Sequence, residues 1–154
     1  MEQIIREELE KIKEDLIAKH VSLGMKASGK WIESLEVKTQ ATRGSIIGQA
    51  YTYQLQAGRK SGTMPPIQAI EEWIKQKGIK PVEDKMKISS LAFIIARKIK
   101  QEGTKYYQQG GTDLIDSVVT PDRIQKIIDR VGSLHVVNLQ SEILELIKRT
   151  ANGN

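Results

Sequence analysis

Two histidines and two adjacent carboxylate pairs are the residues whose types first suggest catalysis. His20 and His135 each lie within or beside an apolar stretch, where histidine is usually a hydrogen-bonded packing residue. The carboxylate pairs are Glu71-Glu72 and Glu83-Asp84. Neighbours in sequence point to different faces of a helix, so neither pair predicts a general acid and base working together. We therefore expect no catalytic residues and no metal site in this chain.

A loop with two glycines, residues 58–62, is the only segment that approaches a phosphate-binding loop. It has the wrong glycine spacing and lacks the Gly-Lys-Ser/Thr ending of such loops. No nucleophile elbow and no dinucleotide-binding glycine pattern occurs elsewhere in the sequence. The sequence thus predicts a protein that is not an enzyme, binds no cofactor and has no small-molecule substrate.

Positive charge is concentrated between residues 75 and 105. This segment has nine basic and three acidic residues, which gives it a net charge of +6. The whole chain carries +5, so the remainder sums to −1. Such a segment can attract a phosphate backbone or an acidic protein surface, or it can be an ordinary solvated lysine face. The candidate basic surface consists of Lys75, Lys77, Lys80, Lys85, Lys87, Lys98, Lys100 and Lys105.

Length and composition indicate one domain of 154 residues with an ordinary core. The sequence has no cysteine, which excludes disulfides, zinc ribbons and iron–sulfur clusters and suits a reducing cytoplasm. The first residues lack a signal-peptide pattern. The longest apolar run, 91–96, is far shorter than the roughly 20 residues of a membrane span. We expect a soluble protein that contacts no membrane.

Hydrophobic periodicity predicts a helix over residues 2–22 and a β region over 34–56. Ile5, Leu9, Ile12 and Leu16 follow the helical period. Apolar and polar residues then alternate from residue 35 to 40, and residues 42–44 are typical of a hairpin turn. The pattern does not decide whether part of 49–56 is strand or helix.

Further helices are expected at about 66–77, 88–102, 121–131 and 139–150. Prolines open the first and third of these, and Gly78 and Gly103 follow the first and second as caps. Gly132 either kinks or ends the third, so the conformation of 132–139 is open. Trp31 and Trp73 sit in apolar patterns and are expected in the core, and residues 151–154 are expected to fray. The predicted fold class is α+β: a small antiparallel sheet or hairpin packed by four to five helices in a single domain, 1–150.

The segment 51–79 resembles the neck and tail-completion proteins of long-tailed bacteriophages. In this family a tyrosine-rich stretch runs into a Gly-Arg loop, here Gly58-Arg59, and then into a Met-Pro-Pro start, here 64–66, followed by a helix ending near Trp-Ile. A later family segment, a helix ending in Glu-Gly-Thr before a glycine- and aromatic-rich loop, resembles residues 91–104. The loop that follows, 106–111, departs from the usual family version, which has Pro and Phe before the last helices. A Ser-Gly pair before the first strand, Ser28-Gly29, also matches. The resemblance covers roughly residues 25–150.

The resemblance implies a structural virion protein of the head–tail connection or of the completed tail. Such proteins commonly form sixfold rings around the channel that DNA traverses, together with other neck or tail proteins. It implies a homo-oligomer in the virion, made in the host cytoplasm during assembly, with non-specific DNA contact as a further expectation. The family offers no catalytic residues to transfer.

The loop after residue 57 is the segment that we expect to make subunit contacts, because rings need interfaces that close. Its candidate residues are Gly58, Arg59, Lys60 and Met64. Arg59 is suited to a bidentate carboxylate contact across an interface, and equally to an exposed loop position in solvent. The alternative function is DNA binding through the basic surface, with affinity falling steeply as salt rises.

Overall fold

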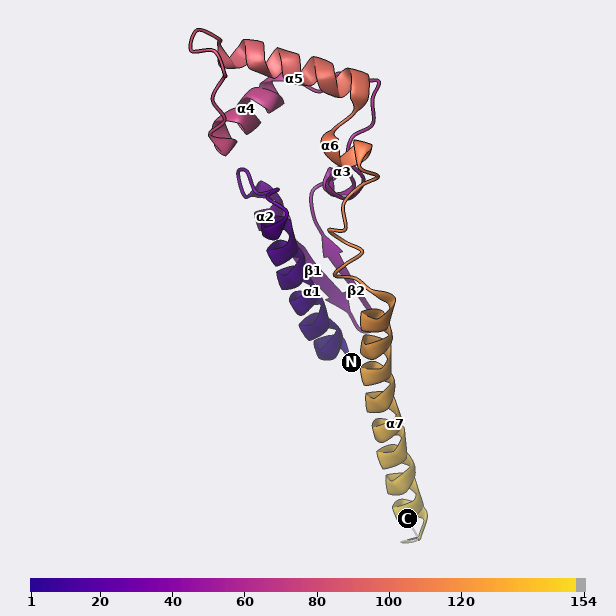
Figure 1. The fold of residues 1–154 in the computed structure, drawn as a ribbon. Coiled ribbons are helices and arrows are strands. Elements are labelled where there is room, and N and C mark those ends of the chain that lie inside the picture. Colours follow the sequence, from indigo (N-terminus) through magenta and orange to yellow (C-terminus); the bar gives the residue numbers. More distant parts are fainter. Residues whose placement is uncertain (152–154) are drawn as a thin grey trace.

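A computed structural model of the protein describes residues 1–151 and shows an elongated α+β molecule (Figure 1). The predicted fold class is confirmed. The helices are α1 (Glu2–Ser22), α2 (Lys30–Ser34), α3 (Thr52–Ala57), α4 (Ile67–Lys77), α5 (Ile88–Glu102), α6 (Lys105–Gln108) and α7 (Pro121–Ala151), and the strands are β1 (Glu36–Gln40) and β2 (Arg43–Ile47). The predicted frayed tail lies outside the described residues, except for Ala151, which is the last residue of α7.

The main core lies where α1 packs against the hairpin of β1 and β2 and against the turn that precedes α7. It is formed by Ile12, Leu16, Trp31, Leu114 and Val118. The apolar stripe predicted for the first helix therefore does face the core, because residues spaced three and four apart share one face of a helix. Salt bridges then tie α7 to the outer side of α1: Arg123 contacts Asp15 at 2.7 Å and Arg130 contacts Glu7 at 3.1 Å.

The hairpin turn lies slightly earlier than predicted. Gln40 pairs with Arg43, so the connection is Ala41-Thr42, and Gly44 lies within β2 opposite Thr39. A side chain at Gly44 would clash with α1, since a Cβ there would lie 2.4 Å from Leu9 Cδ1. Gly44 is thus required for close packing of the strand on α1 rather than for the turn.

The conformation of 49–56, which the sequence leaves open, is largely helical, because β2 ends at Ile47 and residues 52–57 form helix α3. The indole N–H of Trp31 donates a hydrogen bond to Thr52 Oγ1 at 2.9 Å, and that hydroxyl donates to the carbonyl of Gln49 at 2.6 Å. These contacts fix the start of a helical turn. The strand preference of the tyrosines is a weak local bias that such tertiary contacts override.

Helices α4 and α5 form a separate antiparallel pair at one end of the molecule (Figure 1). Ile74, Ala92 and Ala96 are fully buried between them. Alanines at successive turns of α5 allow the two helices to approach closely. Gly78 ends α4 in a left-handed conformation, φ +67°, as its position after the apolar stripe predicts.

The two C-terminal helices predicted at 121–131 and 139–150 are one continuous helix, α7. Gly132 neither kinks nor ends it. A single interior glycine costs a helix only about 1 kcal/mol relative to alanine, which is too little to interrupt flanking turns of good helix formers. The second half of α7 extends away from the rest of the molecule, at the end opposite α4 and α5 (Figure 1). Among residues 1–151, no helix is long and apolar enough to cross a membrane.

Candidate functional site

Two loops that are 45 residues apart in sequence meet in a junction beside α3 and α6. The N–H of Thr104 donates to the carbonyl of Arg59 at 2.9 Å, and the N–H of Arg59 donates to Thr104 Oγ1, also at 2.9 Å. The N–H of Gly62 donates to the carbonyl of Lys100 at 2.8 Å. We call residues 58–62 and 100–107 the loop junction. It unites the Gly-Arg and Glu-Gly-Thr segments that carry the family resemblance.

The loop junction depends on two glycines in the same unusual backbone conformation. Gly58 has φ +76° and ψ 179°, and Gly103 has φ +79° and ψ 178°, a region that is essentially restricted to glycine. A Cβ on Gly58 would lie 2.2 Å from the backbone nitrogen of Tyr107. A Cβ on Gly103 would lie 2.8 Å from the carbonyl oxygen of Arg59. Each loop therefore needs a glycine because the other loop is in contact with it.

Gln56 fastens the base of the loop junction to the turn before α7. Its side-chain oxygen accepts from the N–H of Ile115 at 2.8 Å, and its side-chain nitrogen donates to Asp116 Oδ2 at 2.9 Å. Its carbonyl accepts from the N–H of Thr112 at 2.6 Å. The loops are thus ordered by contacts within the chain rather than by neighbouring subunits alone.

The remaining predicted loop residues lie around the junction with different exposures. The Arg59 side chain is half-buried and reaches only the carbonyl of Thr63, at 3.5 Å. Lys60 is exposed and lines a surface cavity of about 410 Å³ together with Tyr53 and Tyr107. Met64 is half-buried beside the buried Pro65. The Arg59 guanidinium has no carboxylate partner within residues 1–151 and is free to contact one on another molecule.

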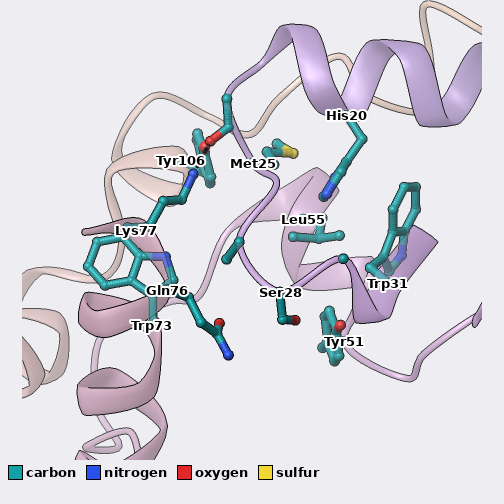
Figure 2. Close-up of a pocket in the computed structure, with 13 residues that line it drawn as sticks. His20, Met25, Ser28, Trp31, Tyr51, Leu55, Trp73, Gln76, Lys77 and Tyr106 are labelled. Atoms are coloured by element: carbon teal, nitrogen blue, oxygen red, sulfur yellow. Dashed lines mark hydrogen bonds between the residues drawn. The ribbon is translucent and has the colours of Figure 1, made fainter. Parts of the chain in front are cut away.

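A second hollow, of about 350 Å³, separates α4 from the end of α1 (Figure 2). Trp73 lines it from α4 and is 38% exposed, so the expectation that both tryptophans are core residues is wrong for Trp73 and right for Trp31. Lys77 crosses from α4 to donate to the carbonyl of Gly24. This hydrogen bond links α4 to the segment that follows α1.

His20 lies on the α1 side of this hollow and is 3% exposed (Figure 2). The centroid of its ring lies 4.4 Å from that of Trp31. Burial, with a smaller contribution from the charge of Lys77, lowers the pKa of His20 below its ordinary value. Its Nδ1 has no hydrogen-bond partner among residues 1–151. His20 is therefore a neutral packing residue, as expected from its apolar surroundings, although it lacks the hydrogen bond that such residues usually have.

The candidate basic surface is spread over α4, the 78–87 connection, α5 and α6. Of its eight lysines, seven are exposed and only Lys77 is half-buried. Within the part of the chain that the structure describes, one of them forms an ion pair, Lys98 with Glu102 at 4.0 Å. The positive charge predicted from the sequence is thus available to a partner.

The sequence did not point to the exposed apolar face of the second half of α7. Seven side chains between residues 136 and 147 are 46–61% exposed there. The apolar residues whose spacing predicts a helix over 139–150 also form this face. The spacing does not predict how the face is oriented relative to the rest of the molecule.

Among residues 1–151, no cluster of three or more His, Asp or Glu side chains is placed to hold a metal ion. His20 and His135 lie far apart, on α1 and on an exposed part of α7. No protein-family model, curated protein or solved structure matches the chain.

Proposed function

We propose that this protein is a non-enzymatic structural subunit of a long-tailed phage particle, acting in head–tail connection or tail completion as part of a ring around the DNA channel. The observation that supports it is the loop junction. The two motifs that carry the resemblance are distant in sequence, yet they contact each other through reciprocal hydrogen bonds between Arg59 and Thr104. The two motifs therefore belong to one structural unit. If the likeness of each segment arose by chance, there would be no reason for the two segments to be in contact.

Arg59 is the residue of this unit that we assign to a partner contact. Its backbone belongs to the loop junction, whereas its guanidinium is left without a carboxylate. A guanidinium held by an ordered loop loses little freedom when it binds a carboxylate on a neighbouring subunit. Oligomer rings use such heterologous contacts, in which one surface of each copy meets a different surface of the next.

The test is incorporation into particles. Quantitative mass spectrometry of purified virions should find this chain at a fixed copy number, expected as a multiple of six, and electron microscopy with a labelled chain should place it at the neck or tail end. A chain absent from purified particles would overturn the proposal. A free monomer in solution would not, because such a subunit can wait for its docking partner.

A substitution pair sharpens this test. Arg59→Ala removes the guanidinium and keeps the backbone contacts, so the purified chain should remain folded while its incorporation falls at least about tenfold, the loss that corresponds to roughly 1.4 kcal/mol. Arg43→Ala, at an exposed position on β2, is the matched control and should be incorporated normally. Equal incorporation of both variants would exclude Arg59 as the contact residue.

The second candidate function is DNA binding through the candidate basic surface. The observation that favours it is the exposure of seven of the eight lysines with so few ion pairs among residues 1–151. Binding should appear in a gel shift at low salt, without sequence preference, and should weaken steeply as salt rises. A gel shift that shows no complex at low salt would remove this candidate.

A further inference from the structure

The second half of α7 carries an apolar face that no other segment of residues 1–151 covers. No side chain of α7 is buried. We call residues 1–135 the body, and the second half of α7 extends away from it (Figure 1). The exposed apolar side chains are Val136, Val137, Leu139, Ile143, Leu144, Leu146 and Ile147. A monomer that leaves so many apolar side chains together in water is unusual, and such patches mark interaction sites.

Helical geometry gathers these side chains on one half of the helix. At 3.6 residues per turn, the seven positions span about half of the circumference. The opposite half holds only polar side chains: Asn138, Ser141, Glu142, Glu145, Lys148 and Arg149. In heptad terms the apolar residues occupy four of the seven positions, whereas a two-stranded coiled coil needs only two. A face this wide lets one helix contact two neighbours.

This face is not a continuation of the one that α7 turns toward its own body. In the first half of the helix, Ile127 packs against the core, and Arg123 and Arg130 form salt bridges with α1. Counted around the helix, those positions lie on the side opposite the apolar face of the second half. The second half therefore points its apolar face away from the surface that the body of the same chain offers.

We propose that the second halves of α7 from more than two copies of this chain pack together in a parallel bundle, each helix lying between two others. This inference rests on the proposed function in that a ring subunit brings copies of the chain together. Residues 136–151 form a helix about 24 Å long and about 10 Å wide, and half of its surface is roughly 400 Å². Two copies would bury roughly 800 Å², less than the about 1,200 Å² of a stable interface, whereas three copies would reach about that value and four would exceed it.

Gln140 is the detail that favours a second copy of this chain over a different partner. Between residues 136 and 147 it is the one polar residue within the apolar face. Thr150 follows on the same face, but its hydroxyl already donates to the carbonyl of Leu146 at 2.9 Å. In a parallel bundle of identical helices in register, the Gln140 amides of all copies lie in one layer and can hydrogen-bond to one another. A single polar layer of this kind is a known means of fixing register and copy number in helix bundles.

Disulfide trapping reads the geometry directly, because the chain has no cysteine of its own. Gln140→Cys should form a disulfide between copies under mild oxidation, since a parallel in-register bundle brings residue 140 of one helix next to residue 140 of another. Asn138→Cys, two residues away on the polar half, is the matched control and should remain at least about tenfold less cross-linked. Equal cross-linking at both positions, or none at residue 140, would overturn the bundle.

Light scattering over a range of protein concentrations tests assembly without cross-linking. The unmodified chain should give a mass above that of a dimer, Ile143→Lys should be a monomer, and Asn138→Lys should match the unmodified chain. The unfolding midpoint of the body in Ile143→Lys should not change, because residue 143 is 46% exposed and lies in the half of α7 that extends away from the body. A monomeric unmodified chain, or an Ile143→Lys variant that assembles normally, would contradict the proposal.

These outcomes separate the bundle from the proposed function. If the chain assembles through α7 but is absent from purified particles, the particle role is overturned and the bundle stands. If the chain is present in particles while the Gln140→Cys variant forms no disulfide either in solution or within them, the bundle is overturned and the particle role stands.

Discussion

Gly58 and Gly103 show how single residues control the loop junction. Each adopts a backbone conformation that is essentially restricted to glycine, and each lies where a Cβ would press on the opposite loop. A side chain at either position would therefore displace the backbone of both loops. The pair is the reason that a hydrogen-bonded contact between such distant segments can form.

We expect Gly58→Ala to destabilise the protein by about 2–5 kcal/mol, the sum of backbone strain and of overpacking against Tyr107. Gly110→Ala is the control. Gly110 also has a positive φ, +82°, but its Cβ would meet nothing within 4 Å, so only about 1–2 kcal/mol should be lost. Denaturant unfolding measures both values. Equal losses would mean that the close contact of the two loops does not matter for stability.

His20 should make stability depend on pH below about 7. Burial, and to a smaller degree Lys77, lowers the pKa of His20 in the folded protein, so the unfolded chain binds the proton more readily, at its ordinary value of about 6.5. Stability is therefore fully present above that value. It is lost as pH falls through it and levels off below the lowered folded pKa.

Urea unfolding at a series of pH values checks this dependence. His20→Phe keeps a ring beside Trp31 and removes the titration, so its stability should be nearly flat over the same range. His135→Gln, at an exposed position on α7, should retain the slope of the unmodified chain. An unchanged slope in His20→Phe would assign the pH dependence to another group.

At the scale of elements, the Gln56 side chain helps to hold α3 to the turn before α7, together with the N–H and the hydroxyl of Thr112. Gln56→Ala would leave the half-buried N–H of Ile115 without its acceptor, at a cost of about 1–3 kcal/mol. Gln54→Ala, on the exposed side of the same helix, should change stability by less than about 0.5 kcal/mol. Thermal or denaturant unfolding distinguishes them, and similar values would show that the contact between α3 and the turn is dispensable.

At the scale of the whole molecule, we expect the stability of the body not to depend on the second half of α7. A chain ending at His135 keeps the salt bridges of Arg123 and Arg130 with α1. Its unfolding free energy should equal that of monomeric Ile143→Lys within about 0.5 kcal/mol, while its helical circular-dichroism signal per molecule decreases. A loss of more than about 2 kcal/mol would indicate that residues 136–154 support the body.

The elongated arrangement places two different surfaces at opposite ends. The lysine-bearing pair α4 and α5 lies at one end, and the apolar half of α7 lies at the other (Figure 1). An assembly held together through α7 would therefore leave the lysines of every copy exposed. Partners that recognise positive charge and copies that cover the apolar face would not compete for the same surface.

The sequence by itself determined the features that depend on neighbours along the chain. The helical spacing of Ile12 and Leu16, the alternation around Val37 and the glycine after α4 predicted α1, β1 and the end of α4, since each signal is complete within a few residues. It also identified Gly58 and Arg59 as loop residues of interest. The α+β class followed from these local patterns together.

Only the tertiary structure decided the features that depend on distant residues. A hydrogen bond from Trp31 made 52–57 a helix, the contact between Arg59 and Thr104 joined two loops into one junction, and the orientation of α7 left one apolar face without a cover. None of these follows from a local period, because each partner lies far away in sequence. The physical reason is that local preferences are weak beside the packing and hydrogen bonding that the complete fold imposes.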